Sequence, residues 1–187
     1  MIHSSRFVAI LDANVLYPAP IRDYLLRLAS LELYKPKWSN EIQKEWIRNL
    51  LTNRPDLKRA NLIATQEAMD SAFPVANISG YEELIVGLSL PDEKDKHILA
   101  AAIRGNADVI VTFNIKHFPA EYLKKYDIEV QHPDEFVSNL INLDKNKSEQ
   151  ALQNLISSLR NPPKTRDEVL HTLEKCGLTK IASMLQK

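Results

Sequence analysis

The sequence contains few of the residues on which several common kinds of site depend. Its 187 residues include one cysteine, Cys176, which excludes an internal disulfide and argues against a zinc site. This cysteine usage favours a reducing, cytoplasmic environment. Only four glycines occur, and neither G-x-x-x-x-G-K-[ST] nor G-x-G-x-x-G is present. We therefore expect no glycine-rich loop of the kind that holds phosphates.

Signals for export, for membranes and for two further kinds of catalytic site are also missing. No apolar run approaches the roughly 20 residues of a membrane-spanning helix, so we expect no membrane association. The N-terminal stretch "MIHSSRFVAILDANV" contains Asp12 and no small-residue cleavage site, which argues against a secretory signal. The five histidines show no H-x-x-x-H spacing, and no G-x-S-x-G is present. The net charge of zero neither indicates nor excludes a nucleic-acid partner, because local patches do the binding.

What the sequence does contain is an alternation of apolar and amphipathic segments. With 44% hydrophobic and 26% charged residues, the composition is that of a globular protein. We predict a parallel α/β sheet with helices on both faces, because the clearest strands are apolar throughout. Strands are predicted at 7–12, 108–113 and 128–130, a short strand with a short helix within 77–88, and helices at 20–33, 38–51, 55–72, 91–107, 119–125 and 133–143.

Some residues mark where these helices begin and end. Ser39 is placed to cap the helix at 38–51, Pro55 suits the first turn of the next helix, and Gly105 marks the end of the helix at 91–107. Trp38 and Trp46 lie on the apolar side of their segment, so we expect them in the core rather than stacked on bases.

From about residue 144 onward the sequence has no strand signal. It predicts two or three short helices, interrupted at Pro162-Pro163 and stopped at Gly177. We divide the chain into an α/β domain, 1–137, and a small all-α C-terminal extension, 138–187. The extension packs on the first domain, forms a homodimer or meets a partner protein, and the sequence does not choose among these.

Carboxylates at or near the ends of predicted elements are the remaining candidates for chemistry. Asp12 comes directly after four apolar strand residues, and the ligand site of an open parallel sheet lies beyond the carboxyl ends of its strands. Each candidate also has a structural alternative. Asp12 could be a helix cap, Asp92 and Asp95 could cap the helix at 91–107, and Glu45 could be a solvated residue facing Arg48 or Asn49.

Taken together, these carboxylates point to a metal site. Mg²⁺ and similar hard cations bind a few carboxylate oxygens and leave other positions to water and phosphate. Carboxylates brought together from separate elements repel one another, and a cation removes that repulsion. A metal bound in this way activates water and neutralises charge on a phosphate, as phosphodiester hydrolysis requires.

Three segments taken together resemble the PIN domain family, and more narrowly its VapC-type toxin branch. They are "ILDANVLYP", "WSNEIQKEWIRNLL" and "DEKDKHILAAAIRGNADVIVTFNIKHFP", in the family's order and spacing over roughly residues 7–137. The helical extension with "NPPKT" resembles the C-terminal extension of some of these toxins. The resemblance implies a Rossmann-like fold and a ribonuclease that depends on Mg²⁺ or Mn²⁺.

The resemblance also assigns residues. Asp12, Glu45 and Asp95 match the family's three acidic positions, and Asp92 is a frequent acidic neighbour. It implies that Asp12, Asp95, Glu45 and Asp92 ligate the metal and that Asp12, Glu45, Asp95 and Asn114 are catalytic. Asn114 stands where many relatives have a fourth aspartate, and its alternative is a structural turn residue.

His117 is a second departure, because an acidic residue is often found at its position. The two departures leave fewer carboxylates for a second metal. Four basic residues could contact phosphates beside the site or simply be solvated: Arg22, Lys37, Arg48 and Arg54.

The leading hypothesis is therefore a metal-dependent endoribonuclease, the toxin of a type II toxin–antitoxin pair, with RNA as substrate and a cognate antitoxin as partner. A catalytically weak PIN-like RNA-binding module is the alternative that Asn114 and His117 favour. A haloacid-dehalogenase-like phosphatase also begins with an aspartate after its first strand. Its chemistry requires a second aspartate two positions later, where this sequence has Asn14.

Overall fold

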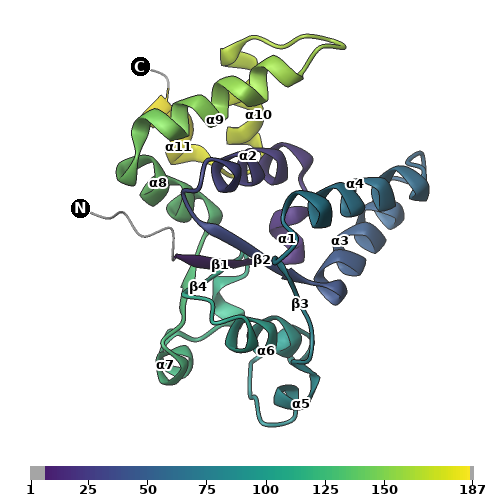
Figure 1. Cartoon of the computed structure of the whole chain (residues 1–187), viewed down its shortest axis with the longest axis vertical. Helices are drawn as coiled ribbons and strands as arrows, with labels where there is room; N and C mark the ends of the chain where they lie inside the picture. The colour runs from purple at the N-terminus through teal and green to yellow at the C-terminus, as the bar shows by residue number, and fades with distance from the viewer. Residues whose placement is uncertain (1–6, 186–187) are drawn as a thin grey trace.

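The computed structural model describes residues 7–185 and contains a five-stranded parallel sheet surrounded by helices (Figure 1). Residues 1–6 and 186–187 lie outside the described residues. They include the start of the stretch considered for a signal and the outer ends of both predicted domains. The strands are β1 (Val8–Leu11), β2 (Lys35–Ser39), β3 (Asn77–Ile78), β4 (Val109–Val111) and β5 (Glu129–Gln131). The predicted α/β fold class is confirmed.

Helices alternate with the strands and then form the C-terminal extension. The α-helices are α1 (Ala13–Leu16), α2 (Ala19–Ser30), α3 (Asn40–Asn53), α4 (Arg59–Ala72), α5 (Glu82–Ile85), α6 (Lys96–Arg104), α7 (Ala120–Leu123), α8 (Pro133–Leu143), α9 (Lys145–Ser158), α10 (Arg166–Lys175) and α11 (Thr179–Leu185). Three short 3₁₀ helices are η1 (Glu93–Asp95), η2 (Ile115–His117) and η3 (Lys124–Tyr126). No helix among residues 7–185 is long and apolar enough to cross a membrane.

The order of the strands is β3-β2-β1-β4-β5, with every neighbouring pair parallel, so β1 lies at the centre. Helix α6 lies against one face of the sheet, and α2 with the C-terminal helices beyond it lies on the other (Figure 1). This explains why β1 and β4 are apolar throughout: both of their faces are covered. Ile10 pairs with Ile110 and Leu11 with Val111, so the carboxyl ends of β1 and β4 lie side by side.

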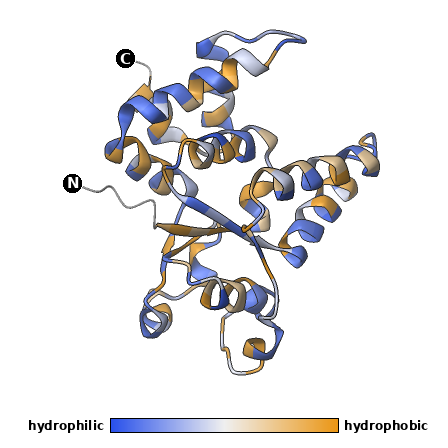
Figure 2. Ribbon diagram, viewed as in Figure 1, coloured by the Kyte–Doolittle hydropathy of each residue, from blue (hydrophilic) through white to orange (hydrophobic). Residues whose placement is uncertain are grey.

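The predicted elements are largely present. The helix predicted at 91–107 is shorter, because α6 spans Lys96–Arg104 and the 3₁₀ helix η1 precedes it, and two further corrections apply. Strand β2 was not predicted, because its residues "KPKWS" are mostly polar and include Pro36; Figure 2 shows its first part as hydrophilic. Pro36 is tolerated because β3 pairs only with Trp38 and Ser39, farther along β2. The second correction concerns α4, which begins at Arg59 and not at Pro55.

The start of α4 is delayed by a turn of the chain that precedes it. The backbone N–H of Leu57 donates to the carbonyl of Arg54 at 3.0 Å, and the Arg54 guanidinium pairs with Asp56 at 2.6 Å. Both contacts are local and stabilise a turn where the sequence suggested helix. Elsewhere Ser39 caps α3 as predicted, with its hydroxyl accepting from the Ile42 N–H, and both tryptophans are fully buried.

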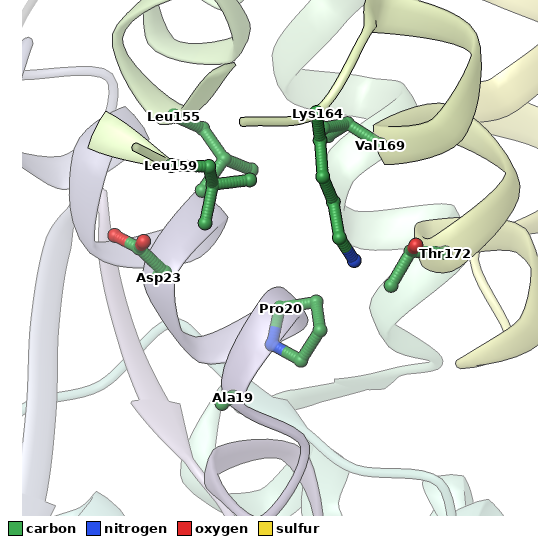
Figure 3. A pocket seen from close by; sticks show the side chains of 8 residues that line it. All are labelled: Ala19, Pro20, Asp23, Leu155, Leu159, Lys164, Val169 and Thr172. Carbon is green, nitrogen blue, oxygen red and sulfur yellow. The ribbon is translucent and has the colours of Figure 1, made fainter. Parts of the chain in front are cut away.

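The C-terminal extension packs on the α/β domain along α2 (Figure 1). The Tyr24 hydroxyl on α2 donates to the Ser148 carbonyl on α9 at 3.2 Å. The boundary that we predicted at 137/138 falls within α8, whose first turn contacts α11. A cavity of about 150 Å³ remains between the start of α2, α9 and α10, and the Lys164 side chain extends into it (Figure 3).

Candidate active site

Asp12 leaves β1 at the centre of the sheet and is only 4% exposed. It occupies the N-cap position of α1, yet its side chain makes no capping hydrogen bond, so the capping alternative is wrong. Its Oδ2 instead accepts from the Thr112 hydroxyl at 2.6 Å and from the Asn14 amide at 2.7 Å. Asp12 is thus held by one side chain from α1, which follows β1, and by one that directly follows β4.

Thr112 and Asn14 are functional candidates that were not predicted from the sequence to contact Asp12. The Asn14 amide nitrogen also donates to the Thr112 hydroxyl at 3.1 Å, and Asn14 Oδ1 accepts from the Phe113 N–H at 3.1 Å. Thr112 Oγ1 further accepts from the Asn114 N–H at 3.0 Å. A signal was present in the sequence: "AILD" and "VIVT" both end an apolar strand on an oxygen-bearing side chain, and neighbouring parallel strands end at the same edge.

Burial raises the pKa of Asp12 from 3.8 to about 6. The hydrogen bond from Thr112 opposes this rise, while the charges of Asp95 and Glu45 add to it. The charges of Glu45, on α3, and of Asp95, just before α6, therefore reach the Asp12 carboxylate after β1. Such a group repels itself unless a cation is bound, and its oxygen donors fit Mg²⁺ or Mn²⁺.

Asp95 lies where η1 joins α6, and its side chain makes no capping hydrogen bond. It contacts His117 instead: Oδ2 lies 2.7 Å from Nδ1 of that imidazole. Burial raises the pKa of Asp95, the His117 contact opposes the rise, and Asp92 and Glu45 add to it. The capping alternative is thus wrong for the Asp95 side chain.

The capping alternative is correct for Asp92, whose Oδ1 accepts from the Lys94 N–H at 3.0 Å at the start of η1. Its other oxygen lies 4.0 Å from His117 Nδ1. Asp92, Asp95 and His117 each place one ligand atom within 4.8 Å of the other two. His117, which the sequence analysis marked only as a departure from the family, thus joins two of the predicted metal ligands in a group that could hold a metal ion.

Glu45 lies on α3, and its Oε2 is 3.5 Å from Nε2 of His97 on α6. The alternative in which Glu45 faces Arg48 or Asn49 is not what the structure shows. The other nitrogen of His97, Nδ1, is buried and has no hydrogen-bond partner among the described residues. Glu45 therefore faces α6, the helix that begins directly after Asp95.

Asn114 is exposed at the N-cap position of η2, and its side chain makes no capping hydrogen bond. Its backbone N–H contacts Thr112, which places it beside Asp12. Arg22, one of the four basic residues considered as phosphate contacts, has a structural role instead. Its guanidinium is buried, donates to the Leu16 carbonyl at 2.6 Å and lies 4.6 Å from the centre of the Trp46 ring. Arg22 therefore stabilises the packing around Trp46 and the end of α1.

Comparisons with known proteins agree with this geometry. The family model described as PIN domain matches residues 8–116, more than half of the chain, which includes β1, α3, α6 and β4. The chain belongs to the PIN domain family. A second model, VapC50 C-terminal domain, matches residues 133–187. The resemblance stated from the sequence is confirmed, and the haloacid-dehalogenase-like alternative is dropped.

One curated relative of this PIN protein is named "Putative ribonuclease VapC50" and comes from Mycobacterium tuberculosis (strain ATCC 25618 / H37Rv). It is 38% identical over 94 residues, which make up 50% of this chain. The match spans 55% of the relative's own length, so only about half of that protein is compared. No solved structure matches the chain.

Proposed function

We propose that this PIN protein is a metal-dependent endoribonuclease and the toxin of a type II toxin–antitoxin pair. The observation that carries the proposal is that the carboxylates of Glu45 and Asp95 lie close enough to Asp12, at the exit of β1, for their charges to raise its pKa. A relative named as a ribonuclease and a second match to a VapC-type C-terminal domain support it.

In this proposal Asp12, Asp95 and Glu45 hold a divalent cation, and Asp92 adds a fourth carboxylate. Bound there, the cation lowers the pKa of water and neutralises negative charge on the scissile phosphate. Thr112 and Asn14 keep the Asp12 carboxylate in one orientation. The exposed Asn114 amide, beside Thr112, positions a water molecule for attack on phosphorus.

We further infer that the site prefers Mn²⁺ to Mg²⁺. His117 offers an imidazole nitrogen next to two carboxylates. Imidazole is a good ligand for transition metals and a poor one for Mg²⁺, which takes oxygen ligands.

The first experiment is cleavage of a mixed RNA pool with Mn²⁺, with Mg²⁺ and with excess EDTA. Wild type is compared with Asp12→Asn and with Asp127→Asn, which makes the same chemical change at an exposed residue just before β5. That position is at the opposite edge of the sheet from the strand exits. Metal-dependent cleavage that is lost in Asp12→Asn and kept in Asp127→Asn is the expected result.

Two other outcomes of this experiment would contradict the proposed nuclease activity. Equal cleavage by wild type and Asp12→Asn would indicate a contaminating nuclease and contradict the proposal. RNA that is bound but not shortened with any of the metals would favour the RNA-binding module. Asn114 and His117 stand where a nuclease of this family often has acidic residues, which agrees with that alternative.

The partner is proposed on electrostatic grounds. A protein that inhibits this site is expected to place an Arg or Lys on the carboxylates of Asp12, Asp95 and Glu45, because a cation of any kind relieves their repulsion. A structure of the complex in which the partner leaves these carboxylates uncovered would contradict this part of the proposal.

A further inference from the structure

The turn between α10 and α11 contacts the segment that leaves β4. Gly177 in this turn has φ of +104°, in the region that favours glycine. A Cβ at this position would lie 3.0 Å from Cε1 of the Phe113 ring. Both the backbone conformation and the space therefore require glycine here. The consequence is that the C-terminal extension lies directly against Phe113.

Phe113 is also held by the start of α8. The His132 ring packs against it edge-to-face with ring centres 5.0 Å apart. Two residues later the buried Asp134 carboxylate accepts from the N–H groups of Lys180 and Ile181, at 3.0 and 3.3 Å, at the start of α11. These bonds tie α8 to α11, so His132 and Gly177 together form one holder for the Phe113 ring, which we call the Phe113 clamp.

The backbone of Phe113 belongs to the candidate active site. Its N–H donates to Asn14 Oδ1 at 3.1 Å, and the Asn14 amide donates to Asp12 Oδ2 at 2.7 Å. Two hydrogen bonds therefore connect the residue held by the C-terminal helices to the central carboxylate. Hydrogen bonds to a metal-ligating side chain fix its orientation and affect metal affinity.

We propose that the C-terminal helices position Asp12 through the Phe113 clamp, with Phe113 and Gly177 as positioning residues. The extension then has two roles: it packs on α2, and it helps to fix the position of the Asp12 side chain. The metal-affinity consequence rests on the proposed function, whereas the positioning of Asn14 does not.

The test uses the full chain, three single variants and the double variant Phe113→Ala/Gly177→Ala. Phe113→Ala removes the ring, and Gly177→Ala disturbs the clamp from the other side while leaving the ring in place. Val169→Ala is the matched control: it removes buried apolar volume from α10, at a side chain that lines the separate cavity shown in Figure 3. Each protein is measured for thermal unfolding, for hydrogen exchange of the backbone amide at position 113, and for Mn²⁺ affinity.

We expect Phe113→Ala and Gly177→Ala to speed exchange at amide 113 and to weaken Mn²⁺ binding by about tenfold. The double variant should lose no more affinity than the stronger single variant, because both changes break one contact. Val169→Ala should lower the unfolding temperature and leave both other readouts unchanged. If the Phe113 clamp does not position Asp12, exchange at amide 113 and Mn²⁺ affinity will be the same in all three single variants. That result would overturn the proposal.

Asp12→Asn separates this inference from the proposed function. If Asp12→Asn binds Mn²⁺ as wild type does, the proposed metal site is wrong, and exchange at amide 113 alone decides whether the clamp positions Asn14. If Asp12→Asn loses Mn²⁺ while the clamp variants bind normally, the metal site stands and the positioning role is refuted.

Discussion

Among single residues, Asp12 is a buried carboxylate whose negative charge is disfavoured by burial and by its acidic neighbours, and a bound cation would stabilise that charge. Burial raises its pKa from 3.8 to about 6, so the folded state binds a proton more tightly than the unfolded state does. Stability without metal therefore falls as the pH rises from about 4 to about 6, by about 3 kcal/mol in total, and stays low above that range.

The first prediction follows from the fall in stability of the metal-free protein as the pH rises. In EDTA at pH 8, Asp12→Asn should be more stable than wild type by up to about 3 kcal/mol, because the amide keeps an oxygen for Thr112 and Asn14 and carries no charge. At pH 4 the difference should vanish. Urea unfolding at both pH values measures it, with Asp127→Asn as the exposed control. A variant less stable than wild type at pH 8 would contradict the prediction.

His117 supports a second prediction at this scale. His117→Asp restores an all-oxygen ligand group with Asp92 and Asp95 and should shift the ratio of Mn²⁺ to Mg²⁺ affinity toward Mg²⁺ by about tenfold. His117→Ala should lose Mn²⁺ affinity more than Mg²⁺ affinity. Competition between the two metals, followed by the electron-spin signal of free Mn²⁺, measures the ratio. An unchanged ratio in both variants would show that the imidazole is not a ligand.

At the scale of elements, the helix starts differ in what they contribute. Asp144 caps α9 within one stretch of chain, through the Lys147 N–H at 2.9 Å. Asp134 links two elements: it is buried in α8, and it accepts from the Thr179 hydroxyl and from two N–H groups at the start of α11. Removing Asp134 leaves buried donors unpaired, which costs more than losing an ordinary cap.

We therefore predict that Asp134→Ala lowers the free energy of unfolding by about 2–3 kcal/mol, while Asp144→Ala lowers it by about 1 kcal/mol. Urea unfolding of the two variants side by side measures the difference. Equal losses would mean that the link between α8 and α11 adds nothing beyond local capping.

The sequence predicted most of these elements from local pattern. The helix predicted at 133–143 is present with those bounds as α8, and its Pro133 and the spacing of Phe136, Val137 and Leu140 are local features of the sequence. Strand β2 could not be found in this way. Its lysines and proline contradict a strand, and its place is set by pairing with β1, which only the fold reveals.

At the scale of the whole molecule, the α/β domain and the extension share contacts on both sides of α8. Helix α9 packs along α2, the Tyr24 hydroxyl of α2 donates to the Ser148 carbonyl of α9 at 3.2 Å, and α11 is tied to the first turn of α8. Each part covers apolar surface of the other. Such coupling favours a single cooperative transition on unfolding.

The fourth prediction tests that coupling. Both tryptophans, Trp38 and Trp46, are buried in the α/β domain, whereas far-ultraviolet circular dichroism also reports α9–α11. We expect urea unfolding curves from tryptophan fluorescence and from circular dichroism to coincide. Loss of helix at a lower urea concentration than the fluorescence change would show that the extension unfolds by itself.

The sequence by itself determined the α/β class, the helical extension and the exit of Asp12 from an apolar strand, because periodicity and strand composition are local properties. It also supplied the carboxylates of Glu45, Asp92 and Asp95 as candidates. The tertiary structure decided their partners: Thr112 with Asp12, His117 with Asp95 and His97 with Glu45. Those contacts join residues far apart in the chain, and strand order and helix packing alone bring such residues together.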